Sequence, residues 1–236
     1  MESIHISPVT PPEVVKEIKG VIFDCDGVLI NSFESNKWYY NKFKEKFDLD
    51  PMTADEEKFV HAHTHAESLK QILPKEIHEQ AFEFCSDPLL KEGINYIQVE
   101  DGLSRLLEWL RTHNIRMGIN TNRTDTLPLV LQKFDIEGFF SPMVTSTTLP
   151  NSKPHPEGVH YILDKWNMKP EEVVYIGDTW VDESCAERAG VEFWAYRSPT
   201  LNARFHVDSY WTLCNLLEKA RNDVWAGCGC GQQKFI

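Results

Sequence analysis

The sequence of 236 residues lacks the features that mark membrane proteins, secreted precursors and repeat arrays. No apolar run approaches the roughly 18–20 residues that a membrane-spanning helix requires. The segment 1–17 contains prolines and acidic residues but no apolar signal-peptide stretch, and we interpret it as a short lead-in to a first strand. Repeats and low-complexity tracts are absent apart from a Cys/Gly-containing tail at 226–236. We therefore expect a soluble protein that does not bind membranes.

Cysteine is too sparse and too scattered to build a disulfide framework. A core of this size does not need such a framework, so the sequence predicts a reduced, cytoplasmic setting. Two thiols in the tail could bind a metal or form a labile disulfide, but a lone pair lacks the further ligands of a closed site, and its role stays open. The six cysteines are Cys25, Cys85, Cys185, Cys214, Cys228 and Cys230.

Basic residues are in deficit, with 24 Lys and Arg against 36 Asp and Glu, for a formal net charge of −12. This balance repels the backbone of nucleic acids and anionic membrane surfaces, so we expect neither as a partner. An acidic chain that acts on an anionic substrate needs local compensation, which a bound divalent cation would supply. The sequence does not determine the oligomeric state, and we leave open a monomer or a homodimer.

Short apolar runs alternate with helical patterns through most of the chain, and 42% of the residues are hydrophobic. This alternation predicts an α/β fold, a three-layer Rossmann-like parallel sheet with helices on both faces. In such sheets, ligands bind at the carboxyl ends of the strands. The predicted strands are 20–23, 115–119, 139–144, 173–176 and 193–196, and the predicted helices are 103–111, 127–134, 158–166, 183–189 and 211–221.

The segment 35–96 differs from the rest because it contains no convincing strand. Apolar residues fall near helical spacing at Trp38, Phe43 and Phe47, Asp50-Pro51 interrupts them, and another helix is expected at about 75–85. We interpret this segment as an α-helical cap inserted after the first strand. The predicted organisation is a catalytic core of 1–34 and 97–225, a cap of 35–96 and a tail of 226–236.

Two carboxylates follow the first predicted strand, at Asp24 and Asp26. A carboxylate can attack phosphorus directly and so divide a hydrolysis into two easier steps. The second carboxylate can donate a proton to the leaving oxygen and later take one from water. The alternative interpretation is an Asp-Gly turn with an incidental second aspartate. Cys25 lies between the two and is interpreted as a small buried residue, because nothing nearby lowers the pKa of its thiol.

A second acidic pair, Asp178 and Asp182, follows the predicted strand 173–176. Carboxylate oxygens suit Mg²⁺, although either residue could instead cap or orient the next helix. Thr121 follows another strand, where a hydroxyl and a backbone N–H could hold phosphate oxygens. Lys153 could supply a compact positive charge next to an anion. Taken singly, Thr121 and Lys153 would be an ordinary strand-end threonine and a surface lysine. Only the order of all these residues along the chain indicates a common site.

That joint order resembles the haloacid dehalogenase superfamily, in particular its phosphatases with a small helical cap. The resemblance covers the chain from Gly20 to Leu217, although the cap matches by position and helical character more than by residue identity. Four ordered motifs carry it: Val21-Ile-Phe-Asp24-Cys-Asp26-Gly-Val28, Gly118-Ile-Asn-Thr121-Asn122, Lys153-Pro-His-Pro156 and Gly177-Asp178-Thr-Trp-Val-Asp182.

The resemblance implies a Mg²⁺-dependent phosphatase that hydrolyses a small phosphorylated metabolite through an aspartyl-phosphate. It implies that Asp24 is the nucleophile and a metal ligand, and that Asp26 is the general acid/base and gives Mg²⁺ its backbone carbonyl. Lys153 would neutralise charge, Asp178 would ligate the metal, and Asp182 would lie in the outer shell of the metal. In-line transfer needs such charge compensation. Thr121 and Asn122 would hold the phosphoryl group.

The resemblance also implies that substrate choice depends on the cap. His61, His63 and His65 alternate, so one face of an extended segment could present them to a phosphate or carboxylate. We select His63 and His65 as candidate phosphate-binding residues; the alternative is a solvated cap surface. Arg123 is a further candidate phosphate ligand, or else a first-turn arginine that faces solvent. Trp180 could wall the site or only pack.

Other activities share part of this pattern. A phosphomutase of the β-phosphoglucomutase type would have all four motifs, but the chain lacks an arginine before Glu67, where such mutases tend to have one. A dehalogenase would lack the second aspartate, and a phosphonatase would need a desolvated cap lysine, which neither Lys58 nor Lys70 suggests. A binding protein without catalysis is the remaining alternative, and the complete motif set argues against it.

Overall fold

The computed structural model describes residues 3–15, 17–85, 87–124 and 126–227. The Cys228 and Cys230 pair of the tail lies outside these residues. Within the described part of the chain, no helix combines the length and apolar character that crossing a bilayer requires.

A seven-stranded parallel sheet forms the centre of the molecule, in the order β1-β9-β8-β7-β2-β5-β6. Its central strands are short apolar runs with every residue buried, as expected where helices cover both faces. The predicted α/β class is confirmed. The strands are β1 Ile4–His5, β2 Gly20–Phe23, β5 Arg116–Asn120, β6 Met143–Val144, β7 Val173–Gly177, β8 Glu192–Tyr196 and β9 Phe205–Val207.

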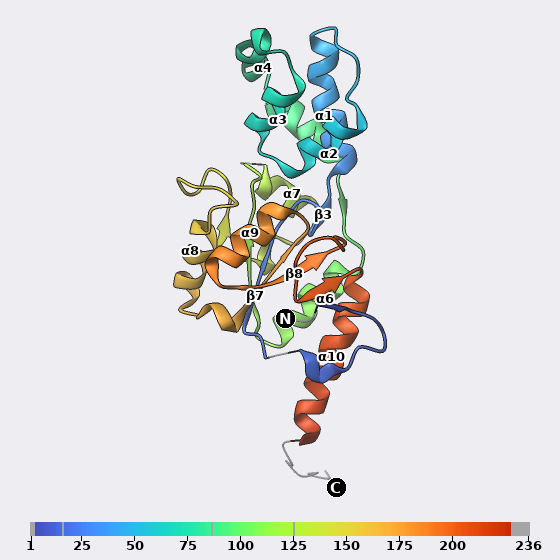
Figure 1. The fold of residues 1–236 in the computed structure, drawn as a ribbon, viewed down its shortest axis with the longest axis vertical. Coiled ribbons are helices and arrows are strands. Elements are labelled where there is room, and N and C mark those ends of the chain that lie inside the picture. The colour runs from blue at the N-terminus through green and yellow to red at the C-terminus, as the bar shows by residue number, and fades with distance from the viewer. Residues whose placement is uncertain (1–2, 16, 86, 125, 228–236) are drawn as a thin grey trace.

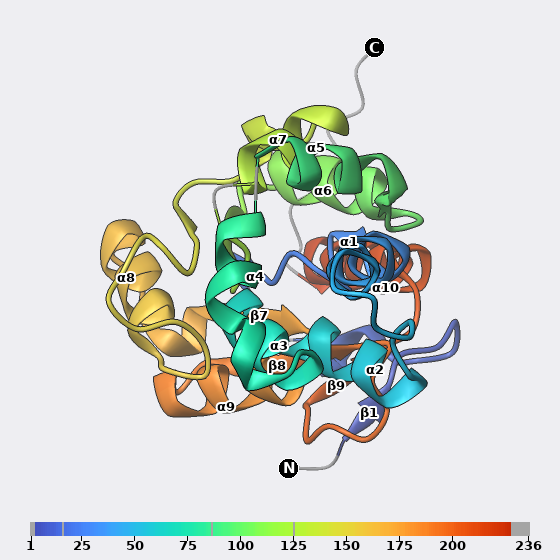
Figure 2. The ribbon, with the colours of Figure 1, turned by 90° about the horizontal axis from the view of Figure 1, so that it is seen from above.

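Helices cover both faces of the sheet, because alternate strand residues point to opposite sides. Val21 and Phe23 pack into one hydrophobic cluster with α6, α7 and α10, whereas Ile22 packs into the other with α8 and α9 (Figure 2). These two clusters make the three layers. The helices are α6 Leu103–Thr112, α7 Leu127–Lys133, α8 Glu157–Trp166, α9 Trp180–Ala189 and α10 Tyr210–Gly227, with 3₁₀ turns at Pro12–Val14, Glu137–Phe139 and Pro170–Glu172.

Several predicted boundaries were wrong. The strand expected at 139–144 is only Met143–Val144, since a 3₁₀ turn occupies Glu137–Phe139 and Pro142 has no N–H for the ladder. Helix α9 begins at Trp180, three residues before the predicted start, and α10 runs on to Gly227. The strands β1 and β9 extend one side of the sheet and were not predicted.

The helices between β3 and β4 stand above the carboxyl end of the sheet (Figure 1). They enclose a hydrophobic cluster of their own, which includes Tyr40, Phe43 and Leu69. The chain enters and leaves this cap through an antiparallel pair of short strands, β3 and β4, in which Ile30 pairs with Val99. The cap elements are β3 Ile30–Asn31, α1 Phe33–Lys46, α2 Ala54–Ala62, α3 His65–Ile72, η2 Lys75–Ile77, α4 His78–Phe84, α5 Asp87–Gly93, η3 Ile94–Tyr96 and β4 Gln98–Val99.

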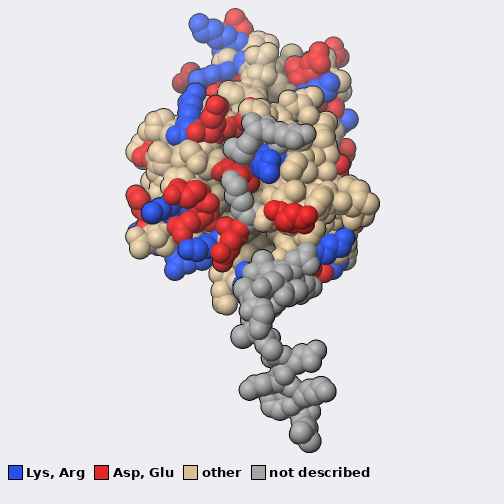
Figure 3. Space-filling view, turned by 60° about the horizontal axis from the view of Figure 1, so that its bottom comes forward, with Lys and Arg blue, Asp and Glu red and all other residues tan. Residues whose placement is uncertain are grey.

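The side of the molecule shown in Figure 3 carries charged side chains of both signs. Among the described residues visible there, Lys and Arg lie between Asp and Glu and do not gather into one basic area. This surface offers no extended cationic stripe of the kind that tracks a nucleic-acid backbone.

Candidate active site

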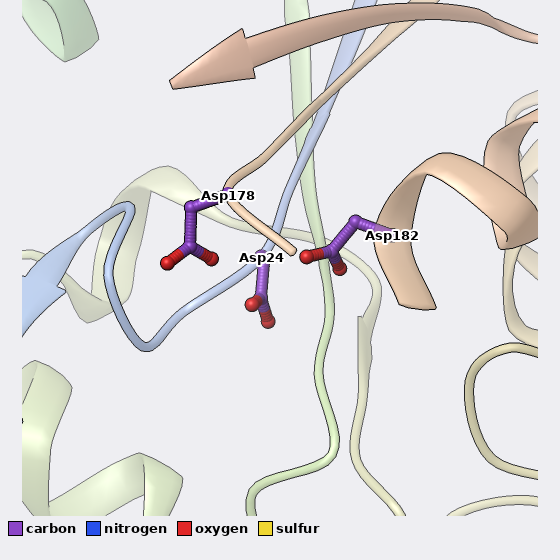
Figure 4. Close-up of side chains that lie close together, drawn as sticks. All are labelled: Asp24, Asp178 and Asp182. Atoms are coloured by element: carbon purple, nitrogen blue, oxygen red, sulfur yellow. The ribbon is translucent and has the colours of Figure 1, made fainter. Parts of the chain in front are cut away.

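Three aspartates converge at the carboxyl end of the sheet (Figure 4). Asp24 follows β2, Asp178 follows the neighbouring β7, and Asp182 lies in the first turn of α9. One carboxylate oxygen from each lies within 4.8 Å of the others. The two acidic motifs, which are more than 150 positions apart in the sequence, therefore form one cluster.

Gly27 makes this convergence possible. Its φ of +76° lies in the left-handed region, and a Cβ built on it would lie 2.0 Å from Oδ2 of Asp178. Only glycine lets the loop after β2 turn this way and pass so close to a carboxylate. The glycine at position 27 therefore allows the loop that carries Asp24 and Asp26 to lie against Asp178.

Lys153 lies between two of the aspartates. Its Nζ is 2.7 Å from Oδ1 of Asp24 and 2.6 Å from Oδ1 of Asp182, and the side chain is buried. Burial acts to lower the pKa of Lys153, but the two carboxylates outweigh it and raise the pKa above its usual range. Lys153 is therefore a fixed cation and not the surface lysine of the alternative interpretation.

Asp182 is saturated with hydrogen bonds. Oδ1 accepts from Lys153 at 2.6 Å and from the Tyr175 hydroxyl at 3.1 Å, while Oδ2 accepts from the backbone N–H and hydroxyl of Thr179 at 3.1 and 2.6 Å. Four donors fill the acceptor positions of a carboxylate. The predicted orienting role fits this geometry better than direct metal ligation. Tyr175 was missed, although a tyrosine in a strand buried on both faces must find a partner for its hydroxyl.

The pKa of the carboxyl group is raised at both Asp24 and Asp178. Burial and the nearby Asp182 raise the pKa of Asp24 to about 7, against the opposing effect of Lys153. Burial, Asp182 and Asp24 raise the pKa of Asp178 well above its usual range. Oδ1 of Asp178 is buried and has no hydrogen-bond partner among the described residues. An unpaired oxygen beside a second carboxylate fits a divalent cation, which prefers oxygen ligands and would favour the ionised forms.

Asp26 points to the other side of the loop, where Arg123 holds it. Arg123 donates from Nε to Oδ2 at 3.0 Å and from Nη2 to Oδ1 at 2.5 Å. The arginine side chain is 12% exposed, and it precedes α7, which begins only at Leu127. The interpretation of Arg123 as a solvent-facing first-turn residue was therefore wrong. Burial acts to raise the pKa of Asp26, but Arg123 outweighs it and lowers the pKa.

Thr121 and Asn122 lie beside these groups. The backbone N–H of Thr121 donates to the carbonyl of Val144 at 2.9 Å, and its Oγ1 accepts from the N–H of Arg123 at 3.1 Å. The hydroxyl proton of Thr121 is therefore available to a ligand. Asn122 donates from Nδ2 to the carbonyl of Lys153 at 3.2 Å, and its Oδ1 has no partner among the described residues. Both side chains line the same cavity as Asp24.

The three cap histidines do not lie on an extended segment, so that prediction was wrong. His61 lies in the last turn of α2, His63 follows the end of that helix, and His65 begins α3. Two capping boxes define these helices, Thr53 with Glu56 and Thr64 with Glu67, and the Thr-x-x-Glu spacing is visible in the sequence. The helix junction nevertheless brings all three imidazoles to one cavity.

Each histidine has its own surroundings. Nε2 of His61 lies 4.0 Å from Oδ2 of Asp178, so this histidine, and not the two selected from the sequence, reaches the acidic cluster. His63 stacks on Phe59 with ring centroids 3.8 Å apart. His65 contacts the Tyr39 hydroxyl through Nε2 at 3.0 Å.

One cavity of about 390 Å³ joins the cap to the core. Asp24, Asp26 and Lys153 line its core side, and the cap histidines line the other. Trp180 is 52% exposed and its ring lies 6.4 Å from that of His63, but it is not among the described residues that line the cavity. The volume is typical of a site for a small molecule. Cys25 is fully buried, and burial raises the pKa of its thiol well above the usual range.

Comparisons with known proteins agree with this geometry. Residues 21–196 match the family model of haloacid dehalogenase-like hydrolases. A phosphorylated carbohydrates phosphatase of Thermotoga maritima is 27% identical over 74% of this chain and 83% of its own length. A pyrophosphatase PpaX of Oceanobacillus iheyensis is 25% identical over 81% of this chain and 91% of its own length.

A solved structure shows the same arrangement of the chain. A hydrolase of the same superfamily from Geobacter sulfurreducens superposes with a TM-score of 0.73 at 30% identity, and the match covers 85% of this chain and all of the other. The family match spans all four motifs that converge on the cavity. The chain belongs to the haloacid dehalogenase-like hydrolase family.

Proposed function

We propose that this hydrolase is a Mg²⁺-dependent phosphatase that cleaves a small phosphomonoester through an aspartyl-phosphate on Asp24. The observation that carries the proposal is the ion pair between Asp24 and Lys153, 2.7 Å long and buried at the floor of the cavity. A fixed cation there lets a carboxylate and a phosphate approach each other despite their like charges.

The chemistry takes two steps. In the first, an oxygen of Asp24 bonds to phosphorus, the bond from phosphorus to the alcohol oxygen breaks, and Asp26 donates a proton to that oxygen. In the second, Asp26 takes a proton from water, the water oxygen bonds to phosphorus, and the bond to Asp24 breaks. Phosphate leaves, and both carboxylates return to their starting states.

Asp26 enters this cycle as the ionised partner of Arg123. Donation in the first step therefore requires that the substrate weaken this pair as it binds and that Asp26 first take up a proton from solvent. The proton that Asp26 regains from water in the second step returns to solvent when the pair with Arg123 forms again. Arg123 would then be close enough to a phosphoryl oxygen to contact it, together with the Thr121 hydroxyl and Asn122.

Asp24 and Asp178, with the backbone carbonyl of Asp26, would hold Mg²⁺, and Asp182 would orient Lys153 from the outer shell. The ion would compensate negative charge on the transferring phosphoryl group. The unpaired Oδ1 of Asp178 supports this assignment. We further propose a cytoplasmic enzyme that acts on a small phosphorylated metabolite.

Hydrolysis of p-nitrophenyl phosphate with MgCl₂ and with EDTA tests the proposal. We expect turnover that requires Mg²⁺ and that falls by at least about 10³-fold in Asp24→Asn, which keeps the shape of the side chain but removes its charge. Asp164→Asn, on the exposed side of α8, is the matched control and should keep native activity. Undiminished turnover by a folded Asp24→Asn variant would refute the assignment of the nucleophile.

A further inference from the structure

The cap side of the cavity carries no permanent positive charge. Among the described residues, no lysine or arginine of the cap lines it. Burial lowers the pKa of His65, which favours its neutral form. The polar and aromatic residues of this cap wall include Asn36, Tyr39, Tyr40, His61, His63 and His65.

The two cations of the cavity come from the core, and carboxylates already occupy both. Lys153 contacts Asp24 at 2.7 Å and Asp182 at 2.6 Å. Arg123 forms two hydrogen bonds with Asp26. Among the described lining residues, no other lysine or arginine is present to bind a second anionic group of a substrate.

A negative charge on the far part of a bound substrate would therefore be desolvated against a wall that has no lysine or arginine among its described residues. An unpaired charge in such a place costs several kcal/mol, whereas a neutral polar group needs only hydrogen bonds. The amide of Asn36, the imidazoles and the phenol rings can provide hydrogen bonds and flat apolar contact. These groups suit the hydroxyl groups and C–H surface of a polyol or sugar.

We infer that this chain selects phosphate esters of uncharged alcohols and discriminates against substrates with a second carboxylate or phosphate. This inference rests on the proposed phosphatase function and narrows its substrate class. It also counts against the mutase alternative, since a bisphosphate intermediate needs a cation for its distal phosphate.

A matched pair of substrates tests the inference. 2-Hydroxyethyl phosphate and 2-phosphoglycolate differ at one carbon, which is a hydroxymethyl carbon in the first and the carboxylate carbon in the second. We expect kcat/KM of the native enzyme to be roughly 50-fold or more higher for 2-hydroxyethyl phosphate. Equal or better turnover of 2-phosphoglycolate would overturn the inference and leave the proposed function intact. Failure to hydrolyse either ester or p-nitrophenyl phosphate would instead overturn the proposed function, and the inference with it.

A charge added to the cap wall should change the preference. His63→Arg keeps stacking on Phe59 possible and places a cation at the cavity, whereas His63→Gln adds no charge. The readout is the ratio of kcat/KM for the two substrates in variants with native circular dichroism. We expect His63→Arg to shift this ratio toward 2-phosphoglycolate about 10-fold and His63→Gln to leave it near the native value. An equal ratio in the two variants would contradict the inference.

Discussion

Arg123 donates two parallel hydrogen bonds to the carboxylate of Asp26, at 3.0 and 2.5 Å, from a position 97 residues further along the chain. A bidentate pair fixes both the position and the plane of a carboxylate. This relationship ties the loop after β2 to the loop after β5 across the mouth of the cavity. It also makes the state of Asp26 dependent on a residue that the substrate phosphate can attract.

Replacing Arg123 tests this relationship. Arg123→Gln leaves a largely buried carboxylate unpaired, so we expect a loss of about 3 kcal/mol in the free energy of unfolding and roughly a 100-fold loss in kcat/KM. Arg123→Lys keeps the positive charge but cannot make the two parallel hydrogen bonds of a guanidinium group. Relative to Arg123→Gln, it should restore more of the free energy of unfolding than of kcat/KM. Arg105→Gln, which removes a half-buried arginine paired with Glu218 away from the cavity, is the control and should change kcat/KM little. Native activity in Arg123→Gln would show that Asp26 does not need this partner.

Gly27→Ala should damage the acidic cluster without changing its chemistry. The new methyl group would overlap Oδ2 of Asp178 and would occupy a backbone conformation with φ +76°. We expect a loss of about 1–3 kcal/mol in the free energy of unfolding and at least roughly 100-fold in kcat/KM. Gly138→Ala is the matched control, because its Cβ meets nothing within 4 Å. The two variants should differ clearly in denaturant titrations and in steady-state kinetics; similar behaviour would argue against the close approach.

Mg²⁺ should stabilise the folded protein through Asp178. A ligand present at 100 times its dissociation constant stabilises the native state by about 2.7 kcal/mol, so added MgCl₂ should raise the Tm in a scanning calorimeter. Asp178→Asn should remove most of this rise, and the exposed Asp164→Asn should keep it. This measurement does not depend on turnover. An unchanged rise in Asp178→Asn would place the ion elsewhere.

His65 should make the stability of the protein depend on pH. Burial lowers the pKa of His65 in the folded state, so its contribution is fully present above the pKa of the unfolded chain, about 6.5. The contribution is lost as the pH falls through the lower, folded-state value. Urea titrations between pH 7.5 and 5 should show a fall in the free energy of unfolding that is smaller in His65→Gln. The exposed His160→Gln should keep the native slope, and an equal slope in His65→Gln would refute the assignment.

The central strands of the fold could be predicted because a strand buried on both faces is a continuous apolar run. β7 is such a run, and it was assigned to within one residue. β1 and β9 have only two and three residues, and no apolar run marks them. β9 pairs with β8, and β1 pairs with β9, and local sequence does not reveal these neighbours.

The sequence predicted which residues form the site better than it predicted the contacts between them. The order of Asp24, Lys153 and Asp178 predicted that these residues would meet, and they do. The partner of Arg123 could not be read from the sequence, because a bidentate pair depends on the approach of two loops in space. The alternation of the three histidines predicted an extended segment, but the capping box of Thr64 and Glu67 begins a helix there, and this local signal determines the backbone.

The antiparallel contact between β3 and β4 has a consequence for how such enzymes diversify. Ile30 lies opposite Val99, so the chain returns to the core almost where it left it. The entropy of closing a loop depends only weakly on its length once its ends are held together. Insertions, deletions or a wholly different helical module between these two strands would therefore leave the sheet and its aspartates nearly undisturbed. The β3–β4 pair therefore allows the cap to be replaced independently of the core, so that the same catalytic residues can be combined with different substrate-binding cavities.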